Sequence, residues 1–207
     1  NSGSGYGGGV RMLNGGTTRN CLISANSSAN YGGGINIWEA GLIQNCTIVN
    51  NTAPNGAGVR CRNNSVMENS ISYLNNGLNW QTNGSGFTFQ YNCTTPALPS
   101  GVGNTTNDPQ FVSSTTGNYR LSSTSPLIDA GLNQAWMTTA KDLDGNNRIF
   151  GGLVSMGAYE FINFDPPILI SPASMTKNVS VIPTLTWQAT PGASSYTVKL
   201  SQDPTYT

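Results

Sequence analysis

Asp142, Asp144 and Asn146 carry oxygen ligands at alternating positions, which is the spacing found in Ca²⁺-binding loops. Gly145 comes too early for an EF-hand loop, and no Glu stands at the twelfth position. The alternative is a turn in which the aspartate side chains accept hydrogen bonds from backbone N–H groups. We favour the turn, retain the three residues as the candidate metal site, and expect no other cofactor.

Acid–base catalysis on sugars requires clustered carboxylates, and the first half of the chain provides almost none. Residues 1–107 contain no Asp, and their two glutamates, Glu39 and Glu68, fall at different positions of the repeat described below. The chain also has no His, which excludes Ser-His-Asp and Cys-His catalysis and every metal site that contains His. We therefore predict no catalytic residues in this part of the chain.

Arg11 and Arg60 share one outward position of the repeat, with Asn36 between them. They could form a basic stripe that binds sugars, although a solvated face is the default interpretation. Trp38 and Trp80 could stack on sugar rings if exposed, but their repeat positions differ, and core packing explains them equally well. A second stack, predicted to be a surface charge ladder, consists of Arg19, Gln44 and Glu68.

These residues belong to an internal repeat of about 24 residues. Three series of similar residues recur with this period, and they keep the same phase relative to one another. The first series consists of the segments that begin at Tyr6, Tyr31 and Asn55. The second series begins at Asn20, Asn45, Asn69 and Asn92. The third series consists of Asn26, Asn51 and Asn75.

Short segments such as Val10-Arg11-Met12 and Ile35-Asn36-Ile37 alternate apolar and polar residues between Gly- and Asn-rich corners. A period of two is typical of strands, and no segment keeps a helical period over three turns. The sequence therefore predicts an all-β fold, a parallel β-solenoid whose equivalent residues stack about 4.8 Å apart. The recurrent Asn side chains should bond from coil to coil. Residues 1–102 should hold at least four coils, and a first coil without a cap predicts further coils upstream.

Cys21, Cys46 and Cys93 occupy one position of the repeat, with Ser70 in the gap, whereas Cys61 lies on another face. No CxxC motif occurs, which argues against zinc and redox motifs. Neighbouring coils would hold the Cβ atoms of Cys21 and Cys46 about 4.8 Å apart, wider than the separation of about 3.8 Å in a disulfide. We predict buried free thiols.

The pattern Tyr-Gly-Gly-Gly-Val, Asn-Cys-x-Ile and a following Asn resembles the right-handed parallel β-helix repeats of secreted bacterial proteins, the pectate-lyase-like superfamily. Residues 103–164 lose the period, and they resemble the choice-of-anchor Q region that closes β-helices in bacterial surface proteins. Ser155 stands where that family often has Asp. The motifs that carry this second resemblance are Asp108-Pro109-Gln110-Phe111, Asn118-Tyr119-Arg120-Leu121, Ser125-Pro126-Leu127-Ile128-Asp129-Ala130-Gly131, Asp142-Leu143-Asp144-Gly145-Asn146 and Met156-Gly157-Ala158-Tyr159-Glu160-Phe161.

Residues 165–207 follow a Pro-rich linker and contain three alternating segments, at 168–172, 183–187 and 195–200. They resemble the opening strands of a fibronectin type III or immunoglobulin-like sandwich, with Trp187 and Tyr196 as core aromatics. Because such a sandwich needs about seven strands, we expect a truncated domain.

The favoured function is a non-catalytic structural or adhesin-type stalk, secreted or on the outer cell surface of a bacterium. One alternative is the C-terminal part of a polysaccharide lyase or glycoside hydrolase whose catalytic coils lie upstream. Another is a subunit of a self-assembling extracellular filament.

The expected partners are a carbohydrate or other cell-surface ligand, a second copy of the chain, or export machinery. Nine Lys and Arg balance nine Asp and Glu, so the basic surplus that nucleic-acid binding needs is missing. The sequence contains no apolar run of about 18 residues, so no membrane span is expected.

Overall fold

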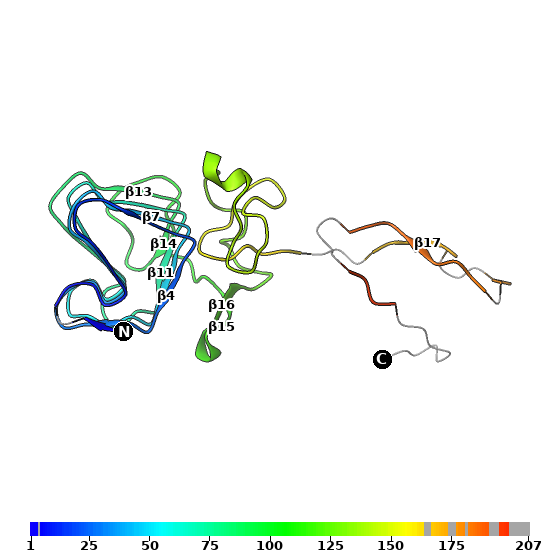
Figure 1. The fold of residues 1–207 in the computed structure, drawn as a ribbon, viewed down its shortest axis with the longest axis horizontal. Coiled ribbons are helices and arrows are strands. Elements are labelled where there is room, and N and C mark those ends of the chain that lie inside the picture. Colours follow the sequence, from blue (N-terminus) through cyan, green and yellow to red (C-terminus); the bar gives the residue numbers. More distant parts are fainter. Residues whose placement is uncertain (4, 164–166, 174–176, 181, 191–194, 199–207) are drawn as a thin grey trace. The chain divides into compact units, whose positions relative to one another are not determined.

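The computed structural model describes the chain except residues 4, 164–166, 174–176, 181, 191–194 and 199–207. The chain divides into two compact units, Asn1–Ile162 and Asn163–Thr207. The first unit, whose ribbon runs from blue to yellow in Figure 1, contains a parallel β-solenoid of about four turns, which confirms the all-β solenoid predicted from the repeat. In the part of the chain that the structure describes, no helix is long and apolar enough to cross a membrane.

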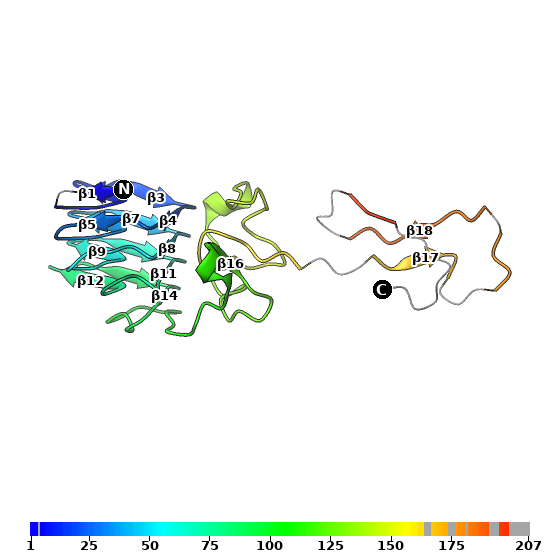
Figure 2. The same cartoon turned by 90° about the horizontal axis from the view of Figure 1, so that it is seen from below.

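Three four-stranded parallel sheets form the sides of the solenoid, and Figure 2 shows their strands stacked coil upon coil. Sheet I consists of β2 (Val10–Met12), β6 (Ile35–Ile37), β9 (Val59–Arg62) and β12 (Trp80–Asn83). Sheet II consists of β3 (Thr17–Arg19), β7 (Leu42–Gln44), β10 (Val66–Glu68) and β13 (Thr88–Gln90). Sheet III consists of β4 (Leu22–Ser24), β8 (Thr47–Val49), β11 (Ile71–Tyr73) and β14 (Cys93–Thr94). A short pair, β1 (Ser2–Gly3) and β5 (Ser27–Ser28), joins the first two coils.

The strand register follows the sequence repeat. Ile35 pairs with Val10 on one side and with Val59 on the other, and the same phase holds in the other two sheets. One side chain of each alternating pair enters a common core, because burial of apolar surface drives the stacking. The core residues are Met12, Ile23, Ile35, Ile37, Ile43, Cys46, Ile48, Val59, Cys61, Met67 and Phe89.

The Asn26 series forms an internal ladder at one corner of the coils. The Asn51 amide oxygen accepts hydrogen bonds from the Asn26 side chain and backbone N–H, both at 3.0 Å. The Asn51 side-chain nitrogen donates to the backbone oxygens of Ile23 and Val49 and to the side chain of Asn75. Each coil thereby satisfies buried backbone groups of its neighbour, which a turn without polar side chains would leave unpaired.

The first three members of the Asn20 series have a different role. The predicted fourth member does not belong with them, because the register pairs Cys93 with Ile71, which moves Asn92 and Cys93 one position from the predicted repeat. Asn20, Asn45 and Asn69 adopt left-handed backbone conformations, with φ of 52°, 48° and 49°, where the chain turns from sheet II into sheet III. Asn tolerates this conformation better than most residues. Their side-chain amides point outward and donate to the backbone oxygens of Lys141, Ser155 and Leu132.

Those acceptors belong to the non-repeating segment 103–162, which lies along the flank of the first three coils. It contains β15 (Phe111–Ser113), β16 (Asn118–Leu121) and the 3₁₀ helices η1 (Ser114–Thr116) and η2 (Ala135–Thr138). Leu121, Leu127 and Met156 pack with Ile71, an outward residue of sheet III, so the segment buries that face. Most of the segment therefore docks on the outward Asn amides and on the apolar side of sheet III, and only its first residues lie on the last coil. Its assignment as a closing region stays a prediction.

Residues 95–106, which lead into this segment, cover the last coil. Leu98 packs against the solenoid core. The Asn104 side-chain oxygen accepts hydrogen bonds from the backbone and side chain of Asn92, at 3.0 and 3.1 Å. Thr105 forms a parallel bridge with Cys93, which extends the pairing of sheet III by one step.

The second unit contains the antiparallel pair β17 (Leu169–Ser171) and β18 (Thr186–Trp187). The rings of Trp187 and Tyr196 are in edge contact, with centroids 5.5 Å apart. Residues 195–198 of the third predicted segment carry no assigned strand, and its last two residues lie outside the described part of the chain. The truncated sandwich stays a prediction.

Candidate functional site: an aromatic–arginine cluster on sheet I

Four polar side chains occupy the outward position of sheet I, one in each coil. The strand register aligns Arg11 with Asn36, Asn36 with Arg60, and Arg60 with Gln81. They alternate with core residues such as Ile35 and Ile37, and so they project from the opposite side of the sheet. The structure thus brings the predicted Arg11 and Arg60 stripe onto one face.

A tyrosine ring contacts each of these two arginines. Tyr6 and Tyr31 precede sheet I in successive coils and stack with centroids 5.3 Å apart. The guanidinium carbons of Arg11 and Arg60 lie 4.9 and 4.1 Å from the ring centres of Tyr6 and Tyr31, respectively.

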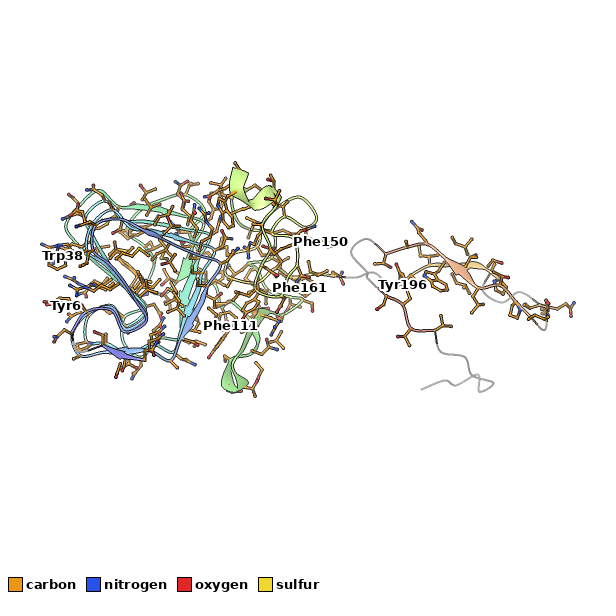
Figure 3. The ribbon with its side chains drawn as sticks, viewed as in Figure 1. Tyr6, Trp38, Phe111, Phe150, Phe161 and Tyr196 are labelled. Atoms are coloured by element: carbon orange, nitrogen blue, oxygen red, sulfur yellow. The ribbon has the colours of Figure 1, made fainter. Side chains whose placement is uncertain are left out.

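Trp38, directly after β6, contributes the remaining ring. Its ring centre lies 3.8 Å from the guanidinium carbon of Arg62, and its ring meets that of Tyr6 edge-on. Figure 3 shows Tyr6 and Trp38 on the same side of the coils, where the ribbon bends inward. We call the following residues the aromatic–arginine cluster: Tyr6, Arg11, Tyr31, Trp38, Arg60 and Arg62.

The glycines between the tyrosines and the strands allow the inward bend. A Cβ atom on Gly8 would lie 2.4 Å from the backbone oxygens of Ser27 and Gly33. A Cβ atom on Gly33 would lie 2.5 Å from the backbone oxygen of Thr52. Only glycine permits such close approach of two backbone segments, and this explains the repeated Gly-Gly-Gly motif.

The cluster carries positive charge without a carboxylate partner. Among the described residues, the two ion pairs involve Arg120 and Arg148, and the cluster arginines take part in neither. Arg60 is only 7% exposed, and burial lowers its pKa while the nearby Tyr31 opposes that effect. A guanidinium that has lost water without gaining an anion is a favourable place for an anionic ligand.

Uncompensated hydrogen-bonding groups lie beside this charge. Four side-chain atoms at the outward position of sheet I find no hydrogen-bond partner among the described residues: both amide atoms of the fully buried Asn36, Nη1 of Arg60 and the side-chain oxygen of Gln81. Trp38 and Tyr6 remain 37% and 41% exposed, so parts of their rings are free for contact. The cluster therefore combines exposed rings, fixed cations and unused polar atoms, which are the groups that recognise sugars bearing acidic substituents.

Of the two tryptophans predicted as sugar platforms, only Trp38 lies in the cluster. Trp80 aligns with the inward Val59, packs against Phe89 with centroids 6.4 Å apart, and donates its indole N–H to the Pro96 backbone oxygen. The tyrosines were not predicted as site residues. The sequence signal that would have identified them is their recurrence as the first residue of the Tyr-Gly-Gly-Gly motif.

The candidate metal residues have other partners. One oxygen of Asp142 accepts hydrogen bonds from the backbone N–H groups of Asp144 and Asn146, and the other accepts from Glu160 N–H and the Asn146 side chain. Asp144 pairs with Arg120. Among the described residues, no group of three or more His, Cys, Asp or Glu could hold a metal ion. This geometry fits the turn interpretation.

We therefore expect Ca²⁺ and a chelator to leave the thermal stability of the chain unchanged. The Asp142 oxygens already receive four N–H donors, and a cation would have to displace them. Differential scanning calorimetry in millimolar CaCl₂ and in EDTA measures this. A melting temperature that rises with Ca²⁺ concentration would show that the turn binds the ion.

The two glutamates of the coils lie at separate places. Glu39 accepts hydrogen bonds from the side chains of Asn63 and Asn64. Glu68 accepts from Gln44 and from Gln134, a residue of the flanking segment. The flanking segment also covers part of the predicted surface charge ladder of Arg19, Gln44 and Glu68. The ring centre of Trp136, a residue of η2, lies 4.1 Å from the guanidinium carbon of Arg19.

Comparison of the chain with protein-family models, with curated proteins and with solved structures found no match.

Proposed function

We propose that this chain is a non-catalytic extracellular module of the adhesin type, in which a rigid solenoid presents the aromatic–arginine cluster to an acidic polysaccharide. The observation that carries the proposal is the set of three arginines held on aromatic rings, none of which has a carboxylate partner among the described residues. A location outside the cell, on or released from a bacterial surface, is part of the proposal and is supported by the resemblances of the repeat and of residues 103–161.

The rigid backbone beneath the cluster supports the proposed role of presenting these side chains to a ligand. Arg60 is fixed by the ring of Tyr31, and the backbone beneath it is paired with a neighbouring coil on each side. A preorganised side chain loses little entropy when a ligand binds. At Gly8 and Gly33 the backbone that follows the tyrosines packs directly against neighbouring backbone, which limits the movement of the cluster.

The positive charge of the cluster arginines supports the proposal that the ligand is acidic. The chain is neutral overall, so the three cluster arginines are a local excess and not part of a generally basic surface. Hydrogen bonds from a guanidinium to a carboxylate are stronger than those to a neutral hydroxyl. The lyase or hydrolase and the filament subunit stay alternatives for a longer protein, and no contact among the described residues favours either.

The test compares polygalacturonate with its methyl-esterified form, which keeps the sugar backbone and removes the charge. We expect the whole chain to bind the acidic polymer, measured by isothermal titration calorimetry, and to bind it more weakly as salt is raised. Arg60→Gln should weaken binding by about 10-fold or more, because a charged hydrogen bond is worth roughly 1.5–3 kcal/mol.

Arg120→Gln is the matched control, since it removes the same charge from an exposed ion pair outside the cluster. It should change the affinity by less than about 2-fold. Trp38→Ala should weaken binding, and Trp136→Ala should not. Equal binding of the esterified polymer, or an equal loss in both arginine variants, would contradict the proposal.

A further inference from the structure

Cys21 and Cys46 are neighbours in successive coils at the corner between sheets II and III. Each follows an Asn in left-handed conformation, and the residues after them, Leu22 and Thr47, are paired in sheet III. The Thr47 N–H donates to the Cys21 backbone oxygen at 2.9 Å. The Cys46 sulfur lies 3.5 Å from the backbone oxygen of Thr18, so this thiol reaches into the coil that carries Cys21.

The two thiols differ in access. Cys46 is fully buried in the solenoid core, whereas Cys21 is only partly buried and packs against that core. A hydrogen bond from Cys46 lowers the pKa of Cys21 to about 6, and burial raises the pKa of Cys46. Cys21 is therefore the first of the two thiols to ionise, and while it is protonated its sulfur donates to the Arg19 backbone oxygen at 3.0 Å.

The pair is distinct from the other cysteines. Ser70 occupies the equivalent position in the third coil, so Cys46 has a serine on its other side, and Ser70 Oγ accepts a hydrogen bond from the Cys46 N–H. Cys61 and Cys93 are buried, and burial raises the pKa of each to about 12. A thiol must be accessible and ionised to react, which singles out Cys21.

We propose that Cys21 and Cys46 form a thiol–disulfide exchange site that joins two coils reversibly when it meets a low-molecular-weight disulfide. The Cys21 thiolate attacks one sulfur of the disulfide RSSR, forms a mixed disulfide and releases RS⁻. Cys46 then gives up its proton and attacks the Cys21 sulfur, which forms the Cys21–Cys46 bond and releases a second RS⁻. Two protein thiols are oxidised, and one external disulfide is reduced to two thiols.

The spacing of the coils makes this bond feasible and readily reversed. Neighbouring strands lie about 4.8 Å apart, within the Cα separation of roughly 4.4–6.8 Å that disulfides accept. The Cβ atoms must approach by about 1 Å, because a disulfide holds them about 3.8 Å apart. A bond under such strain is reduced easily by free thiols, so the dithiol is the resting form. The absence of a CxxC motif does not exclude the pair, since the repeat places its members together.

The test treats the folded chain with oxidised glutathione at pH 7 and maps its cysteines by peptide mass spectrometry. We expect a linked Cys21–Cys46 peptide that lacks about two hydrogen masses, and its loss on addition of reduced glutathione. In the Cys46→Ser variant, the reaction should stop at a single glutathione adduct on Cys21. Cys21→Ser should give neither product. Cys93→Ser, a change at a buried cysteine that the register pairs with Ile71 and not with the Cys21 position, should behave like the unchanged chain.

A second measurement needs no variant. Iodoacetamide should label Cys21 of the folded chain at least about 10-fold faster than Cys61 or Cys93, because only Cys21 is both accessible and ionised. Equal labelling of the cysteines would overturn the proposal. So would adducts on Cys61 or Cys93, or a Cys21 adduct in the unchanged chain that Cys46 never resolves.

Discussion

Replacement of Asn51 by Leu should destabilise the solenoid by at least about 3 kcal/mol, since each buried polar group left without a partner costs roughly 1–3 kcal/mol. Leucine has a similar volume but makes no hydrogen bonds. It would leave the Asn26 N–H and the Ile23 backbone oxygen without their present partners, and it would interrupt the link to Asn75. Because Asn51 joins the second coil to the first and to the third, the loss affects two coil interfaces.

Urea unfolding followed by circular dichroism measures this effect, and Asn76→Leu is the matched control. Asn76 is exposed, and only its backbone takes part in coil pairing. Its replacement should change the free energy of unfolding by less than about 0.5 kcal/mol. Similar losses for Asn51 and Asn76 would mean that the internal ladder does not stabilise the stack.

Replacement of Arg148 by Met should destabilise the first unit by about 3–5 kcal/mol near pH 8, because it leaves a buried carboxylate without its counter-ion. Arg148 and Glu160 form an ion pair of 2.8 Å whose side chains are almost completely buried. Arg148 also donates to the backbone oxygens of Ser155 and Gly157, so it holds the segment that docks on the outward Asn amides. Met fills part of the space but supplies none of these contacts.

The cost of Arg148→Met should fall at lower pH. Burial raises the pKa of Glu160 to about 7, above its usual value of 4.5, and Arg148 opposes that shift. Removal of Arg148 therefore raises the pKa further. A carboxyl group whose pKa is higher in the folded state favours folding at low pH, and that contribution is lost as pH rises through the folded pKa. At pH 5 the lone Glu160 is protonated, and the penalty for burying its charge disappears.

Thermal unfolding at pH 5 and pH 8 measures the difference, with Arg120→Met as the matched control. Arg120 forms the exposed ion pair with Asp144, and pairs of this kind contribute about 0–1 kcal/mol. The Arg120→Met control should lower the stability only slightly at both pH values. A penalty for Arg148→Met that is equal at pH 5 and pH 8 would show that Glu160 does not carry the effect.

The sequence predicted the aromatic–arginine cluster only in part. Arg11 and Arg60 share a repeat position, and this was sufficient to place them on one face of a sheet. Their stacking on Tyr6 and Tyr31 was not predicted, because the tyrosines lie outside the alternating segments and reach the arginines through the inward bend at Gly8 and Gly33. Trp38 and Trp80 were equivalent as candidates until the register placed one outside and one inside.

The architecture of the coils follows from the sequence repeat. Its period specifies which residues stack, and the two-residue alternation specifies which face inward, because both properties are local and recur in every turn. The different roles of the two Asn series depend on contacts that only the folded chain makes. Asn51 bonds to the next coils, whereas Asn20 bonds to Lys141, which is 121 residues away in the sequence. The docking of the non-repeating segment depends on such long-range pairs of backbone and amide groups, and no repeat period carries that information.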